Sequence, residues 1–138
     1  MKPGEIYWVD LATGRRPGIV VSRENLNQGN YVVMVLCTTK RFAIRSKLPN
    51  CVPFHAGEFI MPSDCVAQCE AIYDLEKGEI DIASGTIGRL DATRLRDVIK
   101  AIGTSSTRTA NPLTLRRLHA HIRVLRQLGP AVCLFNPE

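Results

Sequence analysis

The stretch Tyr31-Val32-Val33-Met34-Val35-Leu36-Cys37 predicts the strongest strand of the chain, because it joins β-branched and aromatic residues in one apolar run. The run at 18–22 is also apolar throughout, which indicates a strand buried on both faces. Residues 12–17, directly before the run at 18–22, are predicted to form a turn or loop. Further strands are predicted at 6–9, at 51–60 with an interruption near Ala56-Gly57, and at 63–72. The first half of the chain is therefore predicted to be mainly β.

Two helices are predicted in the second half of the chain. Asp91 is a candidate N-cap, and the apolar spacing from Ala92 to Ile102 is typical of an amphipathic helix that stops at Gly103. A Ser/Thr-rich linker follows at 104–110. Asn111-Pro112 then predicts the start of a second, basic helix whose apolar stripe is most simply a packing face.

Length and composition exclude several classes of protein. The chain has 138 residues, which fits one domain with an appendage. It holds no run of 18 apolar residues and no apolar signal-peptide core, so we expect no membrane association and a cytoplasmic location. Its five cysteines, an odd number without a CxxC pair, indicate reduced thiols and make a poor zinc site. We therefore expect neither a disulfide framework nor a metal.

The positive charge is unevenly distributed. The net charge is +5, of which residues 104–138 contribute five Arg and one Glu. A second basic cluster spans eight residues without an acid and consists of Lys40, Arg41, Arg45 and Lys47. Such clusters attract polyanions, nucleic acid first among them, although most basic clusters are simply solvated surface.

The candidate catalytic residues lie at the ends of the predicted strands. The sequence contains no P-loop, no dinucleotide-binding glycine motif, no HExxH and no GxSxG. What remains is Arg16, held extended before Pro17, and Thr38, at the end of the strongest strand. An Arg fixed in this way can present its guanidinium to a phosphate, but any surface Arg before a Pro would look the same.

A resemblance to a known family rests on several stretches in order. Residues 3–11 (PGEIYWVDL) and 16–22 (RPGIVVS) resemble the opening of the MazF/PemK toxins of type II toxin–antitoxin systems. Weaker support comes from Val33 to Thr38, from 48–50 (LPN), from 64–70, and from 85–91 with the helix after it. The similarity covers about residues 2–103. We therefore expect a barrel domain of this type at 1–103 and a linker with a basic amphipathic helical extension at 104–138.

The resemblance implies an SH3-like and CcdB-like β-barrel with helices, a homodimer, and a cognate antitoxin as partner. It also implies a metal-independent endoribonuclease, without cofactor, that cleaves single-stranded mRNA to 2′,3′-cyclic phosphate and 5′-OH ends. Arg16 matches the family's catalytic Arg and Thr38 its catalytic Thr, with Thr39 as the alternative if the alignment is shifted by one residue. The residues expected to hold RNA are Arg15, Thr39, Lys40, Arg41, Arg45, Lys47 and Tyr73.

One departure from the family pattern leaves other functions open. Some members carry a further Arg where this chain has Tyr73, which can donate a hydrogen bond to phosphate but carries no positive charge. Asp74 beside it is a candidate base or a solvated loop residue. A gyrase-binding toxin of the CcdB type and an RNA-binding module without catalysis therefore remain alternatives to the nuclease.

Overall fold

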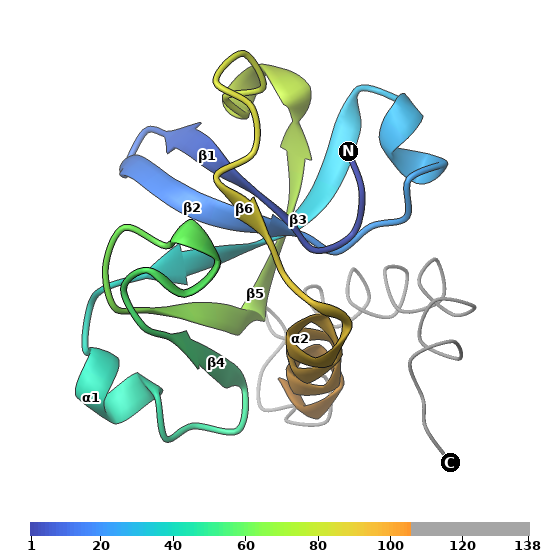
Figure 1. Ribbon diagram of the computed structural model, residues 1–138. Coiled ribbons are helices and arrows are strands. Elements are labelled where there is room, and N and C mark those ends of the chain that lie inside the picture. Colours follow the sequence, from blue (N-terminus) through green and yellow to red (C-terminus); the bar gives the residue numbers. More distant parts are fainter. Residues whose placement is uncertain (106–138) are drawn as a thin grey trace.

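The apolar run at 31–37 forms strand β3 (Tyr31–Thr38), which lies in the middle of the sheet (Figure 1). Its side chains alternate between two apolar clusters, one containing Val33 and Val35 and the other Val32 and Met34. Burial on both faces explains why the run is apolar without interruption. The computed structural model describes residues 1–105.

The sheet is antiparallel and curled, with the strand order β4-β5-β3-β2-β1-β6. The mainly β prediction is thus confirmed. The other strands are β1 (Glu5–Leu11), β2 (Gly14–Val20), β4 (Cys51–Phe54), β5 (Cys65–Glu76) and β6 (Gly88–Arg89). Between them lie the short helix α1 (Phe42–Arg45) and the 3₁₀ turns η1 (Leu26–Gln28), η2 (Glu58–Ile60) and η3 (Lys77–Glu79).

The segment predicted as a loop at 12–17 is mostly strand. The turn consists of Ala12 and Thr13 alone, and β2 already begins at Gly14. Pro17 is tolerated inside β2 for a local reason. Its partner Trp8 accepts a hydrogen bond from Asp81 on the far side of β1, so the pair with Pro17 is a non-hydrogen-bonded one. The missing N–H of Pro17 therefore faces the side where β2 has no pairing with β3.

The predicted strand at 58–60 is wrong, because this segment is the 3₁₀ turn η2. Gly57 has φ +86°, and Phe59 and Ile60 also adopt positive φ values, 48° and 63°. Left-handed backbone cannot continue a strand. The segment instead turns back so that Pro62 and Ser63 lead into β5.

Helix α2 (Ala92–Ser105) is capped as predicted but ends later. The backbone N–H of Arg94 donates to the Asp91 carboxylate at 2.8 Å. The helix continues through the predicted stop at Gly103, and Thr104 Oγ1 donates to the Lys100 carbonyl at 3.1 Å. It packs on β4 and β5 (Figure 1). The predicted basic helix after Asn111 lies outside the described residues. None of the helices within 1–105 has the length and apolarity to cross a membrane.

Gly88 of β6 allows the backbone of η2 to approach β6 closely. A Cβ at this position would collide with the backbone carbonyl of Phe59. We expect Gly88→Ala to lower the free energy of unfolding by about 2–3 kcal/mol, because backbone cannot yield as a side chain does. Gly78→Ala is the matched control, since a Cβ there meets nothing within 4 Å. Urea unfolding of both variants measures the difference, and equal stabilities would contradict this packing.

Candidate active site

Strands β2 and β3 separate at the point where the predicted catalytic residues lie. Their last paired residues are Gly18 and Leu36. Continuing that register by two residues on each strand places Arg16 across from Thr38. Both residues therefore lie where the two strands diverge, Arg16 near the start of β2 and Thr38 at the end of β3.

A cavity of about 330 Å³ lies between the separated strand ends. Both Arg16 and Thr38 line it, so the structure brings the two predicted catalytic residues to one site. Its described walls come from the β1–β2 hairpin, the end of β3 with the residues after it, and the start of β5. They consist of Trp8, Thr13, Gly14, Arg15, Arg16, Pro17, Cys37, Thr38, Thr39, Lys40, Pro62, Ser63 and Cys65.

Thr38 is held rigidly, with only 7% of its surface exposed. On one side it pairs with Val66 of β5. Its Oγ1 accepts a hydrogen bond from the backbone N–H of Lys40 at 3.2 Å. Because this bond uses a lone pair of the oxygen, the hydroxyl hydrogen remains available for donation to a ligand.

Arg16 supplies an uncompensated positive charge. It is half-buried in β2 opposite Val9, and within residues 1–105 it forms no ion pair and no side-chain hydrogen bond. The described lining of the cavity holds two more cations, Arg15 and Lys40, and no carboxylate or imidazole. Such a site favours an anionic ligand and stabilises negative charge that develops on it.

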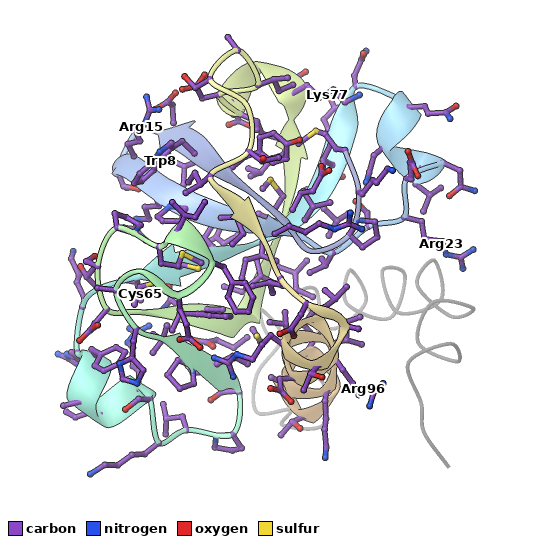
Figure 2. The ribbon with its side chains drawn as sticks, in the orientation of Figure 1. Trp8, Arg15, Arg23, Cys65, Lys77 and Arg96 are labelled. Carbon is purple, nitrogen blue, oxygen red and sulfur yellow. The ribbon has the colours of Figure 1, made fainter. Side chains whose placement is uncertain are left out.

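Arg15 differs from Arg16, because its charge is already paired. Its Nη2 lies 2.6 Å from Asp81 Oδ2, and its Nη1 lies 3.7 Å from Asp10 Oδ1. Its guanidinium carbon sits 5.3 Å above the centre of the Trp8 ring. Figure 2 shows Arg15 and Trp8 side by side at the end of the β1–β2 hairpin. Arg15 thus lines the cavity while bound to protein groups.

The remaining predicted RNA contacts fall into two groups. Thr39 and Lys40 line the cavity and are exposed. The other three basic residues lie outside its lining, just before, on and just after the short helix α1, which follows β3. Among them Arg45 pairs with Glu70 at 3.9 Å, and the two that are exposed are Arg41 and Lys47.

Tyr73 lies outside the lining of the cavity. It pairs with Met34 on β3, whereas Val66 pairs with Thr38. Met34 and Thr38 are four residues apart on β3, which is roughly 13 Å at the usual rise per residue of a strand. Tyr73 and its neighbour Asp74 therefore do not share the cavity with Arg16 and Thr38.

Several lining residues carried no functional signal in the sequence. Trp8 is half-buried at the cavity. Pro62 and Ser63 reach the site only because η2 turns back. Cys37 and Cys65 lie on neighbouring strands, and their proximity depends on a β3–β5 register that the sequence does not reveal.

The two cavity thiols influence each other's ionisation. The Cys37 thiol donates a hydrogen bond to Cys65, which lowers the pKa of Cys65 below its usual value. The same bond, followed by burial, raises the pKa of Cys37 well above it. All four cysteines of the described part are free thiols, as predicted.

Comparison with solved structures shows which fold this is. An endoribonuclease from a mycobacterial species, solved in complex with its cognate antitoxin, matches with a TM-score of 0.63 at 22% identity, covering 80% of this chain and 99% of that one. A MazF toxin of Mycobacterium tuberculosis gives 0.61 at 22% identity, covering 73% and 94%. The MazE–MazF structure from Deinococcus radiodurans gives 0.62 at 17% identity, covering 79% and 97%. A comparison with curated proteins yields no significant match.

The family follows from the sequence itself. A family model described as PemK-like, MazF-like toxin of type II toxin–antitoxin systems matches residues 2–106. This range spans the whole sheet and helix α2, and it contains every residue that lines the cavity. The chain therefore belongs to the PemK-like and MazF-like toxins of type II toxin–antitoxin systems.

Proposed function

We propose that this toxin is an endoribonuclease that cleaves single-stranded RNA without a metal ion. We propose mRNA as its main substrate and the cytoplasm as its location. The observation that carries the proposal is the meeting of Arg16 and Thr38 across one cavity, at the separated ends of β2 and β3. Membership of the toxin family and the endoribonucleases among its structural relatives support it.

RNA brings its own nucleophile to such a site. The 2′-oxygen attacks the adjacent phosphorus, a new P–O2′ bond forms, and the P–O5′ bond breaks. The products are a 2′,3′-cyclic phosphate and a 5′-OH end. Negative charge builds on the non-bridging oxygens in the transition state, and a site that stabilises this charge lowers the barrier.

Arg16 and Thr38 share this stabilisation. The Arg16 guanidinium neutralises the developing charge, and the Thr38 hydroxyl donates a hydrogen bond to the same oxygens. A guanidinium is a poor general base because it is already protonated at neutral pH. The 2′-OH proton therefore leaves to water. The departing 5′-oxygen takes a proton directly from water, or from Arg16, which water then reprotonates.

Outside the cavity, the RNA backbone lies along positively charged side chains. Thr39 and Lys40 extend the cavity wall, and the segment around α1 adds Arg41, Arg45 and Lys47 directly after it. These side chains hold phosphates without regard to base identity. We further propose that the toxin acts as a homodimer and that a cognate antitoxin restrains it by covering this basic surface.

Mapping of RNA ends tests the proposal. Purified protein is incubated with single-stranded RNA in the presence of EDTA, and both new ends are identified chemically. We expect 2′,3′-cyclic phosphate and 5′-OH termini at discrete positions. Intact RNA at high protein concentration contradicts a nuclease. RNA retained in a gel shift would then indicate a binding module, and loss of gyrase supercoiling would indicate a CcdB-type toxin.

A further inference from the structure

The tip of the β1–β2 hairpin has little support from the rest of the sheet. Beyond Gly18 the strand β2 pairs only with β1, so residues 14–17 extend past the edge of β3. Arg16 lies within this tip. Because a two-stranded ribbon is marginally stable on its own, the position of Arg16 depends on whatever holds the tip in place.

Asp81 holds the tip from outside the hairpin. Its backbone N–H donates to the Trp8 carbonyl at 2.9 Å, beside the single bridge between Val9 and Ile80. Its Oδ2 accepts a hydrogen bond from Arg15 Nη2 at 2.6 Å. Within residues 1–105, Asp81 is the only residue beyond the hairpin whose side chain binds a residue of the tip.

The Asp81 carboxylate is itself fixed. Its Oδ1 accepts a hydrogen bond from the Ser84 backbone N–H at 3.1 Å, and only 16% of the side chain is exposed. Hydrogen bonds from Ser84 and then Arg15 hold its pKa below the usual value, so the carboxylate stays ionised at neutral pH. A charge-assisted bond between two held groups is stronger than an ordinary surface ion pair.

We infer that Asp81 is a positioning residue for catalysis: through Arg15 and Trp8 it fixes the hairpin tip and thereby aims the neighbouring Arg16 across the cavity at Thr38. The inference rests on the proposed ribonuclease function. It also assigns a role to Arg15, because its guanidinium is paired with Asp81 and Asp10, lies over Trp8, and so links Asp81 to the hairpin tip. We call this contact of Asp81 with Arg15 and Trp8 the clamp.

The clamp predicts a particular kinetic defect in Asp81→Asn. A displacement of about 1 Å costs on the order of a hundredfold in rate, and the Val9–Ile80 bridge limits how far the tip can move. We therefore expect kcat to fall about tenfold. KM for RNA should stay unchanged or decrease, because the variant removes a negative charge near the phosphates. Asp10→Asn should have a smaller effect, since its contact is 3.7 Å long.

The only tryptophan of the chain gives a readout that does not depend on RNA cleavage. Trp8 lies under the Arg15 guanidinium, so its fluorescence reports the geometry of the tip. We expect Asp81→Asn to shift the emission maximum of Trp8 and to increase the quenching of Trp8 by acrylamide. Glu24→Gln, which alters an exposed carboxylate between β2 and β3 and outside the cavity lining, is the matched control and should change neither signal nor kcat.

A double-mutant cycle tests whether Asp81 acts through Arg15. Asp81→Asn, Arg15→Gln and the double variant are compared for kcat and Trp8 quenching. We expect kcat of the double variant to be no lower than kcat of Arg15→Gln alone, and the quenching of Trp8 to be the same in both, because the two residues form one contact. Additive losses, or unchanged Trp8 quenching in Asp81→Asn, would overturn the inference. If the wild-type protein cleaves no RNA, the proposed function fails, while Trp8 quenching still decides whether the clamp exists.

Discussion

Replacing Arg16 by alanine is expected to lower kcat for RNA cleavage by about a thousandfold, the scale seen when a charge-stabilising group is removed from a preorganised site. Within the described chain Arg16 has no protein partner for its charge, so all of that charge is available to the substrate. The interaction strengthens as the phosphorane forms, and the loss should therefore fall on kcat more than on KM. Single-turnover cleavage of a defined oligoribonucleotide measures it.

Two variants separate catalysis from general charge effects. Arg16→Lys keeps the charge but loses the two-pronged guanidinium, and we expect it to recover only part of the rate. Arg89→Ala removes an exposed cation from β6, outside the cavity lining, and should leave the rate near that of the wild type. The thermal midpoint of Arg16→Ala should be close to that of the wild type. A fully active Arg16→Ala protein would remove Arg16 from the mechanism.

The elements that were predicted well are those determined by interactions between residues close in sequence. The run at 31–37 is apolar at every position because β3 is buried on both faces, and this pattern identifies the segment as a strand. The start of α2 was equally clear, since Asp91 can satisfy the free N–H of Arg94 from its own side chain. Such signals need only neighbours in sequence.

Elements that depend on pairing or packing with another segment were predicted poorly. The loop predicted at 12–17 became strand because β1 offers a partner to residues 14–17. The strand predicted at 58–60 became a turn with left-handed backbone, where Gly88 lets the Phe59 carbonyl approach. In both cases tertiary packing outweighed the local pattern.

The candidate site likewise combines features that could be predicted from the sequence with features that could not. Arg16 and Thr38 were found by resemblance, but no property of either residue indicates that they line one cavity. That relation depends on the β2–β3 register, which is fixed by the alternation of core side chains along both strands. The ion pairs of Arg15 with Asp10 and Asp81 were equally hidden, because Asp81 lies 66 residues away from Arg15 in sequence.

Replacing Thr38 by valine is expected to lower kcat by about a hundredfold, the cost of losing one preorganised hydrogen-bond donor to the transition state. Valine has nearly the shape of threonine, so the packing of this buried position is kept while the hydroxyl is lost. The Lys40 N–H loses its acceptor as well, which should reduce the free energy of unfolding by about 1 kcal/mol. Rate and stability are measured on the same preparation.

Serine at position 38 distinguishes the hydroxyl from the methyl group, because it restores both the donor and the acceptor for Lys40. We expect Thr38→Ser to retain most of the wild-type rate. Thr39→Val is the decisive companion, since Thr39 also lines the cavity but is exposed and lies beyond the end of β3. It should keep kcat near that of the wild type and raise only KM for RNA, because Thr39 is assigned to phosphate binding. If Thr39→Val were inactive and Thr38→Val active, the donor would be Thr39, and the β2–β3 register would no longer explain how the site is assembled.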